Sequence, residues 1–436
     1  MKKKIMNTKY ILILFIFIGF TSCNSPEDVL RDNNVPIEED IQLPALTAGN
    51  ADFSKYVSVG NSLTSGVSDG TLFLAAQQKS FPKILSEKFA LVGGGDFTQP
   101  LVNDNFGGLA LNGNRIAGPR IVVGKDCAGD PLPQGLENVV GDVTVTTDIL
   151  LNNPSGPFNN MGVPLAKSFH LLAPGYGNIA NFPAAANPYF IRMTGTTPNA
   201  SVMELTMAQN PSFFSLWIGN NDVLGYATSG GDGSNPITPV DGPPGVGFNQ
   251  TYGALIATLT SGGAKGVVAN IPYVTDIPHF TTVAWNTLDP TDECQADLAP
   301  QIPVLNAQLY GPLKNIFTAL GEPDRIDLLT ADGPNPLLIQ DETATDRSAE
   351  IAAALTPVLG APTAGAFGAV FGKARQAKED DLIVLSASRV IGNNQPGVPA
   401  PINVNGISFT LAYTWVLITI EQAEIKAAND DLKITI

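Results

Sequence analysis

The chain has 436 residues, of which 44% are hydrophobic, and its formal net charge at pH 7 is −16. This apolar content is sufficient for a sizeable core, and the negative charge argues against nucleic acid as a partner and against attraction to anionic lipid. The sequence contains three cysteines, and none of them has the spacing of a metal site.

The first residues of the chain have the pattern of a bacterial secretion signal. Three lysines (2–4) precede an apolar stretch at 10–20 that is too short to span a membrane as a helix. Phe20-Thr21-Ser22-Cys23 then resembles a lipobox. We therefore expect residues 1–22 to be a lipoprotein signal peptide and Cys23 to be the lipidated first residue of the mature chain. An ordinary cleaved signal with a chance cysteine is the alternative.

A lipidated Cys23 predicts an outer membrane lipoprotein that faces the periplasm or the cell surface. The membrane contact would be the lipid anchor, because several acyl chains on one cysteine bind a bilayer firmly. Residues 23–50 are polar, acidic and rich in Asn and Pro, which is typical of a flexible tether. The folded domain is then expected to cover 51–436.

Short apolar runs alternate with helical patterns along the rest of the chain. The predicted elements, in chain order, are a strand at 56–59, a helix at 81–89, a buried strand at 213–218, a helix at 252–259, a buried strand at 266–271, a helix at 300–320 and a strand at 382–386. This alternation indicates an α/β fold with a central parallel sheet and helices on both faces. Residues 93–160 are rich in Gly, Asn and Pro and read as an insertion, with a Val-Thr alternation at 139–147 that favours a β-hairpin or small sheet.

The end of the chain reads as an amphipathic helix. Residues 419–422 fit a capping box, and Ile425, Leu432 and Ile436 continue an apolar stripe. The sequence stops within this stripe without a glycine or a polar tail. We expect a chain that once continued; a helix that simply docks its last residue is the alternative.

Two polar tetrads carry the chemistry that the sequence suggests. Gly60-Asn61-Ser62-Leu63 follows the strand at 56–59, and Gly219-Asn220-Asn221-Asp222 follows the strand at 213–218. Because ligands bind at the carboxyl ends of the strands of an open α/β sheet, Ser62 is a candidate nucleophile and the Asn221 side chain a candidate oxyanion donor. Taken singly, such residues are more often helix caps or turn residues.

The two tetrads in this order resemble the SGNH or GDSL hydrolase family, and the wider sequence resembles its lipoproteins from Bacteroidetes-type bacteria over residues 50–436. The resemblance implies a three-layer, flavodoxin-like α/β sandwich. Asn61 stands where the family name has aspartate. A middle block, 160–166, implies a backbone N–H donor at Leu165, where the family has glycine. We expect a leucine to resist positive φ there and to crowd the pocket; Gly162 is the alternative if the register is shifted.

The family also places an Asp-x-x-His pair near its carboxyl terminus, and this chain has no such pair in its last 150 residues or so. Its histidines are His170 and His279, and Asp276-Ile277-Pro278-His279 spells the pattern after the strand at 266–271. His279 would share the rim of the sheet with Ser62, oriented by Asp276, and His170 is a weaker candidate base. We expect instead that the usual pair lies beyond Ile436.

The sequence thus predicts a lipid-anchored serine esterase that acts on an acylated glycan, a lipid or a small ester, without a metal or organic cofactor. A catalytically inactive surface lipoprotein that binds glycans or a protein partner is the alternative. Whether Cys127 and Cys294 form a disulfide in an oxidising compartment or stay reduced is left open by the sequence, as is the oligomeric state.

Overall fold

The computed structural model describes residues 45–436 except 128 and 130. The predicted signal peptide, Cys23 and most of the expected tether lie outside the described residues. Residues 48–436 form one unit.

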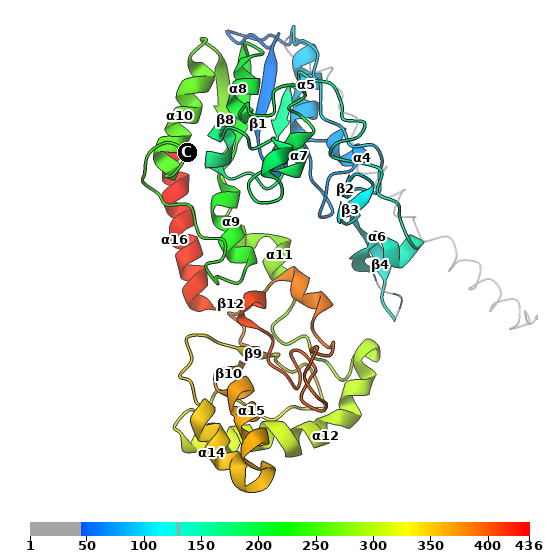
Figure 1. Cartoon of the computed structure of the whole chain (residues 1–436), viewed down its shortest axis with the longest axis vertical. Coiled ribbons are helices and arrows are strands. Elements are labelled where there is room, and N and C mark those ends of the chain that lie inside the picture. Colours follow the sequence, from blue (N-terminus) through cyan, green and yellow to red (C-terminus); the bar gives the residue numbers. More distant parts are fainter. Residues whose placement is uncertain (1–44, 128, 130) are drawn as a thin grey trace, which may run out of the picture. The chain divides into compact units, whose positions relative to one another are not determined.

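A parallel sheet is built from four short strands (Figure 1). They are β1 (Tyr56–Gly60), β6 (Asn160–Gly162), β7 (Phe213–Trp217) and β8 (Lys265–Val268), in the spatial order β6-β1-β7-β8. Numbered along the chain, this order is 2-1-3-4, which is found in doubly wound α/β folds. The predicted α/β class with a central parallel sheet is confirmed, and the strands expected at 56–59 and 213–218 are present.

Helices cover both faces of this sheet. Successive residues of a strand point to opposite faces. On one face, Tyr56 and Phe213 contact Phe89 of α5 (Phe81–Ala90), and Trp217 contacts Phe81. On the other face, Phe214 and Leu216 belong to one apolar core with buried residues of α8 (Val202–Met207) and α10 (Phe248–Thr260). The helices predicted near 81–89 and 252–259 are therefore confirmed.

The expected buried character of the strand at 266–271 is wrong. All four residues of β8 are exposed, Val267 with 51% and Val268 with 43% of their surface. The reason is position: β8 pairs with β7 alone and is an edge strand of the described sheet. The apolar pair Val267-Val268 predicted a strand, but it could not show whether that strand lies in the middle of the sheet or at its edge.

The segment between α5 and β6 carries two β-hairpins, as expected for an insertion. They are β2 (Leu109–Leu111) with β3 (Asn114–Ala117) and β4 (Ile121–Lys125) with β5 (Pro131–Gly135). The Val-Thr alternation at 139–147 is not a strand. Its first residues belong to α6 (Leu136–Val140), and the rest is irregular. Short connecting helices elsewhere in this half are α4 (Leu74–Gln77), η1 (Ser168–Leu172), η2 (Ile179–Asn181) and α7 (Pro188–Ile191).

Residues 283–417, here called the C-terminal lobe, leave the sheet and return to it. The lobe contains η4 (Glu293–Gln301), α12 (Ile302–Leu305), η5 (Asn306–Tyr310), α13 (Gly311–Ala319), β9 (Leu338–Gln340), α14 (Ser348–Leu359), α15 (Ala361–Phe371), β10 (Ala374–Gln376), β11 (Leu382–Ile383), η6 (Leu385–Arg389), η7 (Tyr413–Trp415) and β12 (Val416–Leu417). The helix expected at 300–320 is present. The strand expected at 382–386 is not part of the parallel sheet, because β11 pairs antiparallel with β12.

A disulfide between Cys127 and Cys294 joins the β4–β5 hairpin to the C-terminal lobe. The two cysteines are 167 positions apart, and their Cα atoms lie 5.6 Å apart. Both residues are exposed. Of the two states that the sequence left open, the structure has the paired one.

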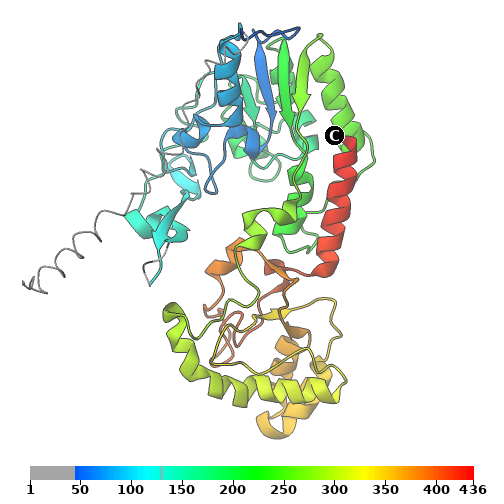
Figure 2. The same cartoon turned by 180° about the vertical axis from the view of Figure 1, so that it is seen from behind.

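The helix α16 (Thr419–Thr435) follows β12 and packs beside α10 and α9 (Asn220–Thr228), as both views show (Figures 1 and 2). Ile425 and Leu432 of the predicted stripe are fully buried. The amide of Asn429 donates to the carbonyl of Pro272, and the Tyr273 hydroxyl donates to Asp430 at 2.6 Å. These bonds tie α16 to the segment that leads into η3 (Val274–Asp276). No helix among the described residues has the length and apolarity needed to cross a bilayer.

Candidate active site

The two polar tetrads lie at the carboxyl ends of neighbouring strands. β1 and β7 pair in parallel with Gly60 opposite Trp217, so the segments that follow them start side by side. The helix α3 (Ser62–Ser65) begins at Ser62, and α9 begins at Asn220. In the strand order 2-1-3-4 the neighbouring first and third strands mark the point where the chain changes direction, which is where doubly wound folds bind ligands.

The residues Asn220, Asn221 and Asp222 each hold a different segment of the chain. The side-chain oxygen of Asn220 accepts a hydrogen bond from the side-chain amide of Asn61 at 2.6 Å. The Asn221 amide donates to the carbonyl of Ala166 at 2.9 Å. The Asp222 carboxylate accepts from the backbone N–H and the hydroxyl of Ser168, at 2.8 and 2.7 Å. The start of α9 therefore fixes both the segment of Ser62 and the middle block.

Asp222 is fully buried, and its charge is held by these bonds. Burial raises the pKa of its carboxyl, while the two Ser168 donors and the nearby Lys167 ammonium act in the opposite direction. A buried carboxylate with several donors is a structural anchor as long as each donor stays in place. Ser168 could not be identified from the sequence, because a single serine in a loop has no distinguishing pattern.

Ser62 occupies the first position of α3 and is partly exposed. The Asn61 side chain caps this helix by accepting from the Leu63 N–H at 3.2 Å. Within the part of the chain that the structure describes, no residue makes a hydrogen bond to the Ser62 hydroxyl. Gly60 makes the turn feasible, because a Cβ there would lie 2.2 Å from the Thr64 hydroxyl and 2.3 Å from the carbonyl of Trp217.

Leu165 adopts a left-handed backbone conformation with φ of +67°. The expectation that a leucine would resist this conformation at the glycine position of the middle block is wrong. The conformation costs about 1–2 kcal/mol for a residue with a Cβ, and the bonds from Asn221 and Asp222 to the following residues hold it. The side chain points outward, with 68% of its surface exposed. Among the described residues, no acceptor bonds to the Leu165 N–H.

The backbone N–H of Gly162, the alternative oxyanion donor, already has an acceptor within the protein. Its N–H donates to the Asn160 side chain at 3.0 Å, and the residue is buried in β6. A Cβ at this position would lie 2.3 Å from the backbone nitrogen of Ser65. The role of Gly162 is therefore the close packing of β6 against α3.

His279 and Asp276 do not form the expected pair. Asp276 ends η3 and is exposed, while His279 lies in the next helix, α11 (Pro278–Thr281). Ile277 between them is extended, which interrupts the helical spacing that would bring the two side chains together. The His279 Nε2 atom is buried without a hydrogen-bond partner among the described residues. Desolvation lowers the pKa of its imidazole, which favours the neutral ring.

The imidazole of His170 makes local interactions with neighbouring residues. Its Nδ1 accepts from the Lys167 N–H at 3.0 Å, and its ring stacks on Tyr176 with 4.5 Å between ring centres. Burial and then the Lys167 charge lower its pKa to about 4. Neither histidine has a hydrogen bond or ring contact with Ser62 or Asn221 in the described chain.

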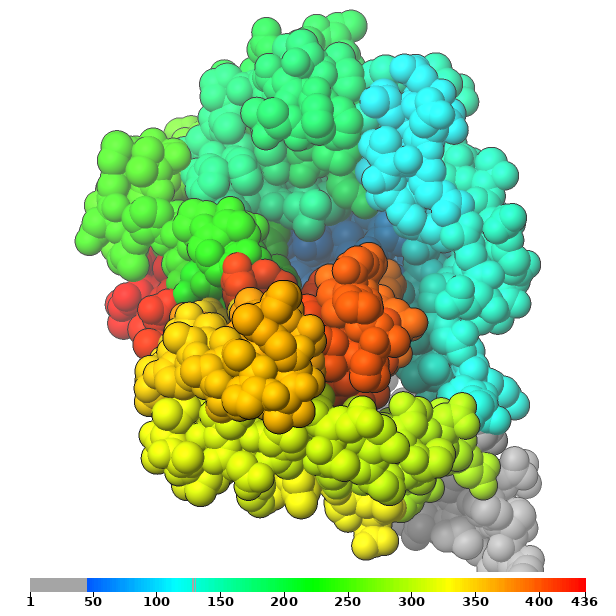
Figure 3. Space-filling view, turned by 60° about the horizontal axis from the view of Figure 1, so that its bottom comes forward, coloured from blue at the N-terminus to red at the C-terminus, as the bar shows by residue number. Residues whose placement is uncertain are grey.

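A hollow opens where the sheet meets the C-terminal lobe (Figure 3). Its floor is formed by the blue segment near the start of the described chain, and its rim by green, teal and orange segments that are distant in sequence.

No group of His, Cys, Asp or Glu among the described residues is arranged to hold a metal ion. Comparisons with protein-family models, curated proteins and solved structures found no match to this chain.

Proposed function

We propose that the protein is a serine ester hydrolase of the SGNH type. The observation that supports this most is the placement of Ser62 and Asn221 after adjoining parallel strands, with their preceding residues joined by the Asn61–Asn220 hydrogen bond. The open N–H of Leu165 beside this pair gives further support, because its left-handed backbone reproduces the conformation that a glycine would adopt.

In the proposed reaction the Ser62 hydroxyl oxygen attacks the carbonyl carbon of an ester. The proton of the hydroxyl passes to a general base, and the carbonyl oxygen becomes an oxyanion. The second N–H of the Asn221 amide, the Ser62 N–H and the Leu165 N–H are the donors that would stabilise this oxyanion. The alcohol then leaves with a proton, and water releases the acid from the acyl-enzyme.

His279 is the candidate base within the described chain. A base must be unprotonated to accept the Ser62 proton, and a neutral, unpartnered imidazole satisfies this condition. Its lowered pKa makes it a weaker base than an ordinary histidine. In the proposal Asp276 has no orienting role, because it is exposed and separated from His279 by the extended Ile277.

We further propose that the protein is attached to the outer membrane through a lipidated Cys23. The substrate would be an acylated glycan, a lipid or a small ester. These classes share the carboxylic ester, which is the only group that the proposed mechanism requires.

Hydrolysis of p-nitrophenyl butyrate by the wild type and by Ser62→Ala tests the proposal. We expect the substitution to lower kcat by about four orders of magnitude or more if the full relay operates, and to leave the fold intact. Ser68→Ala is the matched control, because Ser68 follows the same strand but lies outside α3. Equal background rates in the wild type and Ser62→Ala would refute the proposal.

A catalytically silent surface lipoprotein is the second candidate, and one observation favours it. Neither histidine contacts Ser62 in the described structure. The wild-type and Ser62→Ala rates separate the two candidates, and in a chain that has activity His279→Ala tests whether His279 is the base. If His279 is the base, the substitution lowers the rate. The loss is then larger at pH 7 than at pH 9, where hydroxide can accept the proton instead. An unchanged rate removes His279 from the mechanism.

A further inference from the structure

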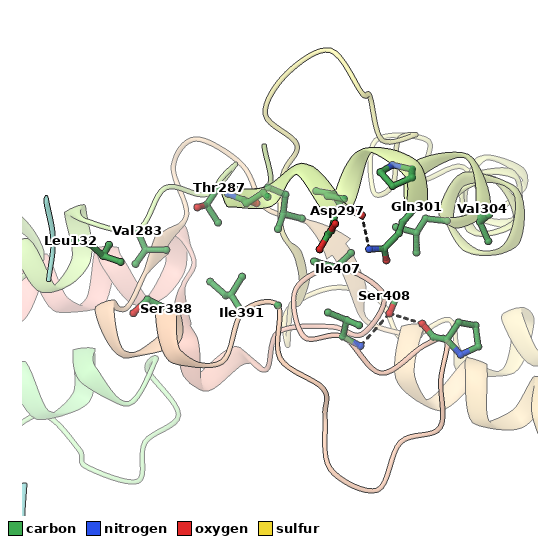
Figure 4. A pocket seen from close by; sticks show the side chains of 18 of the residues that line it. Leu132, Val283, Thr287, Asp297, Gln301, Val304, Ser388, Ile391, Ile407 and Ser408 are labelled. Carbon is green, nitrogen blue, oxygen red and sulfur yellow. Dashed lines mark hydrogen bonds between the residues drawn. The ribbon is translucent and has the colours of Figure 1, made fainter. Parts of the chain in front are cut away.

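The C-terminal lobe carries an apolar cavity of about 770 Å³ that is partly open to solvent, here called the inner cavity. Figure 4 shows Asp297, Gln301 and Val304 on one side of it, and Ile391, Ile407 and Ser408 on the other. Leu132 of the β4–β5 hairpin contributes to the wall from outside the lobe. The volume is that of a typical small-molecule site.

A second apolar cavity of about 520 Å³, the outer cavity, adjoins the first. The two share four lining residues: Val304, Leu305, Pro401 and Ser408. The two cavities therefore adjoin across these residues. Two adjoining apolar spaces suit a flexible chain better than a compact ring system, because a chain can extend from one into the other.

The lining has a charge pattern that restricts the ligand. Asp297 is the only charged side chain among the described lining residues of the inner cavity, and the outer cavity has none. A ligand carboxylate would be repelled by Asp297 and would find no Lys or Arg partner in the lining. Burying such an unpaired anion is costly. A ligand with a neutral polar head instead finds hydroxyl and amide groups, such as Thr287 and Gln301.

The outer cavity reaches the surface at the turn between α14 and α15. Val358, which lines it, has 80% of its surface exposed, and Leu359 beside it has 37%. Residues 351–372, which cover most of this helical hairpin, contain no Asp, Glu, Lys, Arg or His. An uncharged apolar mouth that continues into an apolar cavity provides a path for a ligand that dissolves poorly in water.

We propose that the two cavities form a binding site for one neutral long-chain lipid, whose acyl or alkyl chain fills both cavities and enters past Val358. The site lies in the C-terminal lobe, and its occupation does not depend on the hydrolase activity proposed for Ser62. Each methylene of the chain that leaves water contributes to affinity, so longer chains bind more tightly until both cavities are filled.

The test uses the full chain and 1-O-hexadecylglycerol, a neutral ether that an esterase cannot cleave. Displacement of Nile red by this lipid measures its affinity. Val304→Asp, which places a charge on the wall common to both cavities, is expected to weaken binding by about tenfold or more. Val304 is 52% exposed, so the substitution is compatible with folding. Ile420→Asp, at a helical residue that is 53% exposed and lines neither cavity, is the control.

Val304→Trp tests the same wall by filling space without adding charge, and it serves if Val304→Asp fails to fold. Palmitate, which has the same chain length and a carboxylate, is expected to bind at least about tenfold more weakly than the ether. Equal binding by the wild type and both Val304 variants would overturn the proposal. So would palmitate binding as tightly as the ether, or no saturable binding at all.

Vesicles of phosphatidylcholine, mixed with a Cys23→Ala chain that lacks the proposed lipid anchor, distinguish a membrane from free lipid as the source. If the protein co-sediments with the vesicles and Val358→Asp abolishes this, the source of the lipid is a membrane. If the protein binds the dispersed ether but does not co-sediment with vesicles, the source is free lipid. Self-association of the chain that Val358→Asp abolishes, without saturable lipid binding, would overturn the proposal in favour of a second copy as the occupant of the mouth.

Discussion

The amide of Asn61 donates to the carbonyl oxygen of Asn220 at 2.6 Å, and this bond joins the residue before Ser62 to the residue before Asn221. Both side chains are buried. Asn61 also caps α3 through its carbonyl oxygen. One carboxamide therefore sets the start of α3, where Ser62 lies, and joins it to the start of α9.

Asn61→Ala and Asn61→Asp should differ sharply in stability. Alanine leaves the Asn220 oxygen buried without a donor and removes the cap, and we expect a loss of about 1–3 kcal/mol in the free energy of unfolding. Aspartate keeps the cap and accepts from an Asn220 amide that has turned over, so a loss below about 1 kcal/mol is expected. Urea unfolding measures both values. An alanine variant as stable as the wild type would show that the bond is not formed.

Asn221→Asp tests the proposed role of the Asn221 amide as an oxyanion donor. The change replaces the amide that donates to Ala166 with a carboxylate, which cannot donate and repels an oxyanion. We expect kcat for p-nitrophenyl butyrate to fall by about 10²–10³-fold.

Asn220→Asp is the matched control for this substitution. It is the same chemical change one residue earlier, and it keeps the oxygen that accepts from Asn61. If both variants lose activity to the same extent, the loss reports the fold of the α9 start and not the donor at Asn221.

The sequence predicted the parts of this site that depend on strands and failed where tertiary packing decides. Short apolar runs located β1 and β7, and a parallel sheet places their ends together, so the placement of Ser62 and Asn221 after adjoining strands follows from pattern alone. The supporting bonds of Asp222 with Ser168 link residues 54 positions apart, and no local pattern encodes them. The left-handed Leu165 was also out of reach, because intrinsic preference opposes it and only its neighbours hold it.

The strand pairing of the C-terminal lobe was beyond prediction for a related reason. Its strands are two or three residues long, and β11 pairs antiparallel with β12 from more than 30 positions away. An apolar run of this length fits a central strand, an edge strand or a helix segment equally well. The choice is made by what the run packs against.

At position 165 glycine should be more stabilising than alanine, which is the reverse of the order that is usual inside a helix or strand. Glycine adopts φ of +67° without a steric cost, whereas alanine retains the Cβ that makes this conformation unfavourable. We expect the glycine variant to be more stable than the alanine variant by about 1 kcal/mol, although glycine gains more entropy on unfolding. Thermal unfolding of the two variants measures the difference. An alanine variant of equal or greater stability would indicate that residue 165 is not left-handed in solution.

The Cys127–Cys294 disulfide should stabilise the chain by about 2–5 kcal/mol, because it closes a long loop in the unfolded state. Both cysteines are exposed, so a reducing agent has access to them without unfolding. We expect dithiothreitol to lower the Tm of the wild type. The double variant Cys127→Ser, Cys294→Ser should have the lower Tm from the start and should not respond to dithiothreitol. A response of the double variant would assign the effect to something other than this bond.

Glu421 should make stability depend on pH near neutrality. The residue is 5% exposed, and its side chain accepts from the Ile418 N–H at the start of α16. Burial, followed by the charges of Glu342 and Asp341, raises the pKa of Glu421 to about 7. A carboxyl whose pKa is higher in the folded than in the unfolded chain binds its proton more tightly when folded. Its contribution is fully present below the unfolded value of about 4.5 and is lost as the pH rises through about 7.

Glu421→Gln isolates this contribution, because glutamine stays neutral and retains the oxygen that accepts from Ile418. The variant and the wild type should have similar free energies of unfolding at pH 4.5. At pH 8 the variant should be more stable by up to about 3 kcal/mol. Asp431→Asn, at an exposed carboxylate of the same helix, controls for the general effect of removing one negative charge from an acidic protein. A difference between Glu421→Gln and the wild type that stays constant from pH 4.5 to pH 8 would contradict a raised pKa at this position, since only a group that titrates between those values changes the balance with pH.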